Sequence, residues 1–227
     1  MKRHILLAAF LLLAMTAAFA QDYNRTDSKG RRQGLWTGYH PNGQKRYEGQ
    51  FKNDRPKGLF NYYDEHGNLQ ATNSFDRSGE KAANKTYAPD GTLLAEGNYV
   101  SQKKDGVWKY YDNSGRLILV EDNKNGKVDG WSRIYNAETG TLAEETEFVD
   151  GLPNGVCKKY RENGVLLMEC HYVKGLLEGA SKTYYANTNV KEEGNYCHGE
   201  KCGQWKTYNE DGDMIAVDSY DKEIIED

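Results

Sequence analysis

Hydrophobic and polar positions recur along this chain with a period of 24 residues. When residues are counted from the one that opens each unit (position 0), most units have Gly at position 9, an apolar residue at position 11 and an aromatic residue at position 17. The units open at Gly34, Gly58, Ala82, Gly106, Gly130, Gly155, Gly179 and Gly203. The fifth unit carries one inserted residue. A fixed period of this length indicates a repeat architecture.

Position 5 is Tyr in every unit, and these residues mark the predicted structural core of the repeat. They are Tyr39, Tyr63, Tyr87, Tyr111, Tyr135, Tyr160, Tyr184 and Tyr208. Each unit reads as a β-hairpin with strands at positions 1–6 and 10–18. The polar turn between them, such as residues 40–43, places Pro and then Gly where a type I turn with a Gly bulge needs them.

One hairpin cannot bury its apolar face alone, so neighbouring units must complete it. We therefore predict an all-β fold, an elongated single-layer antiparallel meander of about eight 24-residue hairpins. Unit three, which opens with Ala82 and lacks a Trp, predicts either a bend in the sheet or simple sequence drift.

The register of the hairpins has two solutions. A three-residue loop places position 5 opposite position 11, so that the Tyr, the apolar residue and the aromatic residue at position 17 share one side. That register also puts the basic residues of position 3, such as Lys109, beside the tyrosines. A four-residue loop instead makes the basic column at position 3 and the acidic column at position 14 cross-strand neighbours. The sequence leaves both open.

The ends of the chain differ from the repeat. Residues 1–20 have a short basic start, an apolar run and the small residues Ala18 and Ala20, which is typical of a signal peptide cleaved near Ala20. The domain prediction is then a capping segment at 21–33, a repeat domain at 34–220 and an acidic tail at 221–227. We expect an exported protein, periplasmic or extracellular.

The charge balance limits the partners. The whole chain has a net charge of −4, and loss of the signal peptide makes it about −6. Such a surface repels nucleic acid, and it disfavours association with an anionic membrane without excluding it.

The phrase Gly-x-Trp-x-x-Tyr, followed by Gly-x-Leu, occurs at 106–117 as GVWKYYDNSGRL. In this phrase the chain resembles the MORN-repeat family, and most of all its bacterial variant repeats, which are often grouped as antitoxins of toxin–antitoxin systems. The resemblance covers residues 22–220. It implies a twisted antiparallel sheet used in protein–protein contacts, with a lipid-binding role also proposed for the wider family. If the chain is exported, it acts outside the cytoplasm, and an antitoxin role would then be closer to immunity in the cell envelope.

The four cysteines all lie in the last third of the chain. Cys197 and Cys202 bracket a strand reversal, which favours a disulfide between them. Cys157 and Cys170, at positions 2 and 15 of unit six, share a face only in the four-residue register, and their disulfide is the second prediction. A metal site using Cys170-His171 and Cys197-His198 is the alternative, but adjacent strand residues point to opposite faces.

No catalytic motif, metal site or cofactor is predicted. The patterns of serine hydrolases, zinc proteases and P-loops are missing from the sequence. A single-layer sheet also offers no deep pocket in which to shift the pKa of a catalytic group. We therefore expect a protein that is not an enzyme.

The leading hypothesis is a non-enzymatic scaffold or binding module for a still unidentified protein partner. Trp36, Trp108 and Trp205 stand at position 2 and form the predicted binding surface, because Trp contributes strongly to interfaces. Two alternatives use the same aromatic and Lys-bearing sheet. One is association with a membrane surface, and the other is binding of carbohydrate, whose rings stack on aromatic side chains.

Overall fold

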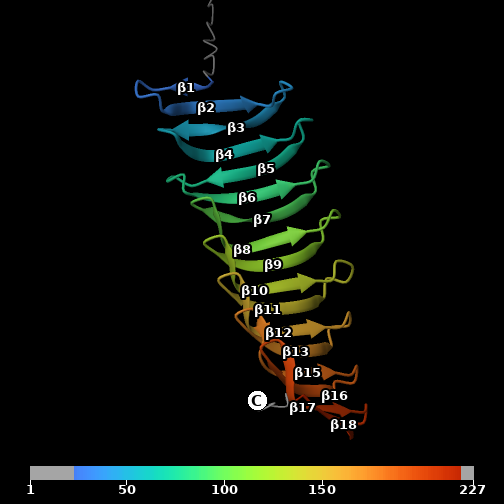
Figure 1. The fold of residues 1–227 in the computed structure, drawn as a ribbon. Coiled ribbons are helices and arrows are strands. Elements are labelled where there is room, and N and C mark those ends of the chain that lie inside the picture. Colours follow the sequence, from blue (N-terminus) through green and yellow to red (C-terminus); the bar gives the residue numbers. More distant parts are fainter. Residues whose placement is uncertain (1–22, 221–227) are drawn as a thin grey trace, which may run out of the picture.

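The repeat forms one open antiparallel sheet in the computed structural model, which describes residues 23–220. The predicted signal peptide and acidic tail lie outside the described residues. Between residues 23 and 220 the chain contains no helix, so none that could cross a membrane. Figure 1 shows the strands stacked along one axis, with β1 and β18 at opposite ends.

The sheet has eighteen strands, two of which, β1 and β14, are only two residues long. The strands are β1 (Arg25–Thr26), β2 (Arg32–Tyr39), β3 (Lys45–Lys52), β4 (Arg55–Tyr63), β5 (Leu69–Phe75), β6 (Lys81–Tyr87), β7 (Leu93–Val100), β8 (Lys103–Tyr111), β9 (Leu117–Lys124), β10 (Lys127–Tyr135), β11 (Leu142–Val149), β12 (Leu152–Tyr160), β13 (Leu166–Val173), β14 (Leu176–Leu177), β15 (Gly179–Tyr184), β16 (Val190–Cys197), β17 (Glu200–Tyr208) and β18 (Met214–Ser219).

Each strand pairs with the strands before and after it in the sequence, apart from the short β14, which pairs with β13 beside β15. Units one to eight are the successive hairpins from β2–β3 to β17–β18, with β14 and β15 together forming the first arm of unit seven. The predicted fold class, an all-β meander of hairpin repeats, is confirmed.

The two ends of the hairpins use different turns. Within a unit, the N–H of Gly43 donates to the carbonyl of His40 and the N–H of His40 donates to the carbonyl of Gln44, as expected for a three-residue loop with a left-handed Gly. Between units the chain reverses over two residues with positive φ, such as Asn53 and Asp54. This is the type I′ turn that matches the twist of antiparallel strands.

The register combines the two predicted solutions. In unit one Tyr39 (position 5) lies opposite Lys45 (position 11), as a three-residue loop requires. A β-bulge at Arg46 (position 12) then shifts the ladder by one residue, so that position 3 pairs with position 14 and position 2 with position 15. The aromatic residue at position 17 therefore lies on the side opposite the tyrosines. This is the placement expected for the four-residue register and not the one expected for the three-residue register.

A second bulge lies at the opening Gly of the units. The ladder between β3 and β4 is interrupted at Gly58, whose φ is 68°. Residues 58–60 together lie opposite Gly49, so this bulge has two extra residues. Its first residue is in the left-handed region, which Gly adopts without strain, and this explains the Gly at position 0. Unit three has Ala82 there, and its pairing with β5 runs on without a shift. Because the ladder is regular here, position 0 needs no Gly, and the chain reverses through a longer loop at residues 76–80.

The bulges give the sheet two different faces. Positions 3, 5, 11 and 14 form what we call the Tyr–Glu face, and positions 2, 4, 15 and 17 form the ring face. All buried apolar side chains of the described residues belong to the ring face or its margin. They are Phe51, Phe60, Ala82, Trp108, Cys157, Cys170 and Trp205. The core is thus one-sided, and the tyrosines at position 5 lie on the other face.

Candidate binding surfaces

The Tyr–Glu face is held together by hydrogen bonds between units. The hydroxyl of the position-5 Tyr donates to the position-14 Glu of the preceding unit, for example from Tyr160 to Glu145 over 2.8 Å. Four more bonds repeat this pattern: Tyr63–Glu48, Tyr111–Glu96, Tyr184–Glu169 and Tyr208–Glu193. In these five units the position-5 Tyr is therefore a polar cross-link between hairpins.

The basic column at position 3 is neutralised on the same face. Arg133 and Glu145 pair at 3.5 Å, and Lys182 and Glu193 at 3.0 Å. Burial and the hydrogen bond to Glu145 raise the pKa of Tyr160 to about 12. Because the basic and acidic columns compensate each other locally, this face offers little net positive charge to an anionic membrane.

The position-2 tryptophans lie within the ring face rather than on its surface. Trp108 and Trp205 are each only 2% exposed. The structure therefore does not support these two residues as a contact surface. Trp36 is half-buried, with its ring 6.1 Å from that of Phe51. The expectation that Trp108 and Trp205 form part of the binding surface is corrected: they are buried structural rings, whereas Trp36 stays a prediction.

Their burial on a single-layer sheet has two causes. Each ring lies flat over a Gly at position 15 of the preceding unit: a Cβ on Gly97 would come within 2.4 Å of the Trp108 ring. The opposite side of the ring is covered by a Lys at position −2, since Lys104 Nζ lies 4.6 Å from the Trp108 ring centroid. The pairs Gly49–Phe60 and Gly194–Trp205 repeat the close contact. This coupling of Gly and ring is visible in the sequence, where it could have been found.

Unit three breaks this pattern and leaves a cavity. Asn84 stands at position 2 and Asn73 at position 15 of the preceding unit, where units two, four and eight have a ring and a Gly. Units five, six and seven also lack a ring at position 2, where they have Ser132, Cys157 and Ser181. A cavity of about 690 Å³ opens over these two residues, with Phe75 and Tyr99 in its lining. We call it the ring-free slot. Sequence analysis singled out unit three without identifying it as a site.

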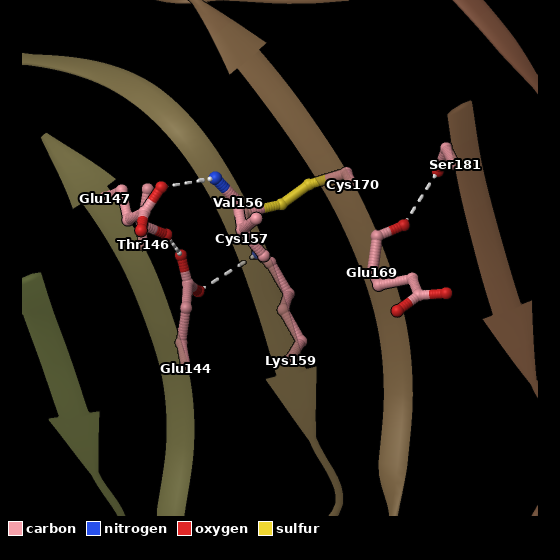
Figure 2. The surroundings of a disulfide bond; sticks show 9 residues. All are labelled: Glu144, Thr146, Glu147, Val156, Cys157, Lys159, Glu169, Cys170 and Ser181. Atoms are coloured by element: carbon pink, nitrogen blue, oxygen red, sulfur yellow. Dashed lines mark hydrogen bonds and ion pairs between the residues drawn. A yellow bond between two sulfur atoms is a disulfide. The ribbon is translucent and has the colours of Figure 1, made fainter. Parts of the chain in front are cut away.

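Both cysteine pairs lie at disulfide distance. Cys157 and Cys170 are directly opposite each other on β12 and β13, with 5.0 Å between their Cα atoms, and Figure 2 shows the bridge between the two strands. The bulge at position 12 brings them onto one face. Cys197 and Cys202 have Cα atoms 5.8 Å apart. These pairs are compatible with an oxidising environment.

Four aliphatic side chains form an apolar edge patch at the turns between units five and seven. Val149 and Leu152 pair across one turn, and Val173 and Leu176 pair across the next. They are 49%, 52%, 40% and 50% exposed, respectively. Corresponding positions in the first half of the chain are mostly basic. They are Lys52 and Arg55, Val100 and Lys103, and Lys124 and Lys127. This patch was not predicted from the sequence, because it lies at the turns between units and not on a face of the sheet.

Candidate metal ligands do not gather in the described part of the chain. No group of three or more His, Cys, Asp or Glu side chains there could hold an ion. The ring of His40, for example, forms a hydrogen bond through Nε2 with the carbonyl oxygen of Tyr63, at 2.9 Å.

Comparisons with known proteins identify the repeat. The family model of the MORN repeat variant matches residues 32–53, 153–174 and 177–198. These segments lie along units one, six and seven. No curated protein matches the chain.

Solved structures with similar segments include large proteins. A crystal structure of TarM shares 15% identity over 43% of this chain and 20% of that chain, with a TM-score of 0.31. A S. aureus TarM mutant in complex with Fondaparinux, alpha-GlcNAc-glycerol and UDP shares 12% identity over 43% and 19%, with a TM-score of 0.33. TcdB2-TccC3 shares 14% identity over 81% and 12%, with a TM-score of 0.21. This chain thus spans at most a fifth of each, and the likeness carries no functional argument.

Proposed function

Because the chain carries repeats of the MORN variant family, we propose that it is an exported, non-enzymatic binding module that holds a protein partner at its apolar edge patch. The repeat itself supports a binding module. The two disulfide pairs support export, because such bonds persist in oxidising compartments.

The observation that carries the proposal is the apolar edge patch. Leu152 lies against the following turn, with its Cδ2 3.9 Å from the Cβ position of Gly175, and Leu176 lies in the same way against Gly199. Their outer surfaces face solvent. Clustered aliphatic side chains on an otherwise polar protein mark protein–protein interaction sites, whereas single exposed apolar residues are ordinary. Val149 and Val173, which pair with these two leucines across their turns, extend the patch.

The test compares a patch variant with a matched control. Leu152→Glu/Leu176→Glu places two carboxylates in the patch, and Leu59→Glu/Val107→Glu does the same at aliphatic residues that are equally exposed elsewhere (57% and 48%). Exposed substitutions change the free energy of unfolding by only about 0.5 kcal/mol each. Both variants should therefore fold.

The immobilised proteins are incubated with an envelope extract of the host, and the retained proteins are identified by mass spectrometry. We expect one protein to be enriched on the wild type and the control and lost on the patch variant, with its affinity then measured by calorimetry. Retention by all three proteins would place the contact elsewhere. No enrichment on the folded wild type would contradict the proposed function.

A further inference from the structure

The ring-free slot has the place and the walls of a missing aromatic side chain. In unit two, Phe60 fills position 2 between Phe51 and Phe75, with ring centroids 5.1 and 5.2 Å away. In unit eight, Trp205 lies between Tyr196 and Tyr220, at 5.1 and 6.5 Å. Each contact is edge-to-face. In these two units the position-2 ring therefore bridges the position-17 rings on its two sides.

In unit three the two flanking rings are present and the bridging ring is not. Phe75 contacts Phe60 on one side, and Tyr99 contacts Trp108 on the other, with centroids 5.0 Å apart. Asn84 stands between them, buried at 7% exposure. The inner sides of Phe75 and Tyr99 line the cavity.

The floor of the slot is polar and well ordered. Asn84 Nδ2 donates to Asn73 Oδ1 at 2.7 Å, and Thr86 Oγ1 donates to Asn84 Oδ1 at 3.2 Å. Asn73 occupies the position that is Gly beneath the rings of units two, four and eight. The two changes belong together, because each flat position-2 ring of these units lies in close contact with a Gly at position 15 of the preceding unit.

The cover of the slot has the opposite charge from that over the Trp rings of units four and eight. Lys104 and Lys201, at position −2, lie 4.6 and 3.8 Å from the ring centroids of Trp108 and Trp205. In unit three position −2 is Glu80, which is exposed and lines the cavity. Its loop is fixed by Asp76, whose Oδ1 accepts the N–H groups of Ser78 and Gly79 at 3.1 and 2.9 Å.

We propose that the ring-free slot binds an aromatic side chain of a protein partner that carries a Lys or Arg next to it. The ring enters between Phe75 and Tyr99 and restores the edge-to-face contacts of the filled units. The neighbouring cation meets Glu80 and covers the ring as Lys104 covers Trp108. The inference rests on the proposed function in that a protein supplies the ring.

The size and lining of the slot agree with this occupant. A volume of about 690 Å³ is larger than one side chain and lies in the range of ligand sites of roughly 300–1,000 Å³. Aromatic residues anchored in pockets with a polar rim are the usual centres of protein interfaces. Edge-to-face ring pairs add a favourable contact beyond the area they bury.

The test is an NMR titration of the purified protein with both disulfides formed. The probe is N-acetyl-Trp-Lys-amide, and the side-chain amide signals of Asn73 and Asn84 report on the slot. We expect saturable shifts of these signals and of the Phe75 and Tyr99 ring signals. N-acetyl-Trp-Glu-amide should bind about threefold more weakly, as expected for one exposed ion pair. N-acetyl-Leu-Lys-amide should cause no saturable shift.

Two variants keep the proposal falsifiable. Asn73→Gly/Asn84→Trp copies the Gly97–Trp108 pair and fills the slot from within, so the probe should bind at least tenfold more weakly. Glu80→Lys lies on an exposed loop and leaves the slot open, and it should reverse the preference between the Lys and Glu probes. Equal binding of the probe to the filled variant, or a charge preference that Glu80→Lys leaves unchanged, would overturn the proposal.

Two further outcomes count against it. If methyl β-glucoside shifts the Asn84 signals and the Trp probe does not, the slot takes a sugar ring instead. If no probe shifts them, the slot is structural, while capture of a partner by the apolar edge patch is unaffected. Conversely, slot binding without any captured protein would contradict the proposed function alone.

Discussion

Gly97 lies in close contact with the Trp108 ring. We therefore predict that Gly97→Ala lowers the free energy of unfolding when this ring is present and does not lower it when the ring is removed. Gly97→Ala adds a Cβ that would lie 2.4, 2.5 and 2.6 Å from three atoms of the Trp108 indole. Carbon atoms in contact are ordinarily about 3.5–4.0 Å apart, so the ring would have to move by roughly 1 Å. Trp108 is held in place, because its indole N–H donates to the carbonyl of Asn98 at 3.0 Å.

Overpacking of this kind costs about 1–3 kcal/mol, and the fixed ring places Gly97→Ala near the upper end. A loss of about 3 kcal/mol corresponds to a fall in Tm of roughly 6–12 °C for a chain of this size. With Trp108→Ala as background the clash disappears. Ala is also favoured over Gly inside a strand by about 0.5–1 kcal/mol, so there Gly97→Ala should be neutral or stabilising.

The assay is chemical denaturation of the wild type, both single variants and the double variant, followed by circular dichroism and by tryptophan fluorescence. The four free energies of unfolding form a double-mutant cycle. We expect a coupling of about 3 kcal/mol. Additive effects, or a Gly97→Ala variant as stable as the wild type, would refute the idea that the Gly is retained to admit the ring.

Three further predictions concern strain, acid and the disulfide. Thr188 has a φ of 72°, which disfavours a β-branched residue by about 1–2 kcal/mol; Thr188→Gly should therefore raise the free energy of unfolding by about 1 kcal/mol in urea denaturation, and a loss would contradict the strain. The hydrogen bond from Lys45 lowers the pKa of Glu48 from 4.5 to about 2. Its contribution to stability is thus complete above pH 4.5 and lost as the pH falls towards 2. The difference between wild type and Glu48→Gln should narrow over that range, and a constant difference would count against the ion pair. Cys157→Ala/Cys170→Ala opens a loop with a sequence separation of 13 residues and should cost about 3 kcal/mol; equal urea midpoints for the variant and the oxidised wild type would show that the bridge contributes little.

Much of the fold follows from the sequence because the repeat is local. The invariant Tyr, the Pro and Gly of the turns and the period of 24 residues are enough for hairpins in a meander. The side of the sheet on which position 17 lies could not be predicted. It depends on one bulged residue such as Arg46, and a shift of one residue moves every following side chain to the other face.

The candidate sites were harder to predict than the fold. Trp108 and Trp205 were expected at the surface because a single layer was taken to leave both faces wet. Their burial depends on contacts across the boundary between units, with Gly97 beneath one ring and Lys104 above it. Analysis of each unit by itself overlooks such contacts. For the same reason unit three was noticed only for its missing Gly and Trp, and the pairing of Asn73 with Asn84 was not predicted.

The pairing of each ring with a Gly of the preceding unit has a consequence for how such chains grow. When a segment that runs from one opening Gly to the next is duplicated, its position-2 ring is separated from the Gly at position 15 of the preceding unit. It can then place Trp205 over the Asn73 of another unit, where it does not fit. A block that runs from one intra-unit turn to the next carries both partners. We therefore expect duplications in this chain to be tolerated best with boundaries in the middle of the hairpin, near Gly91 or Gly115, rather than at the opening Gly of the units.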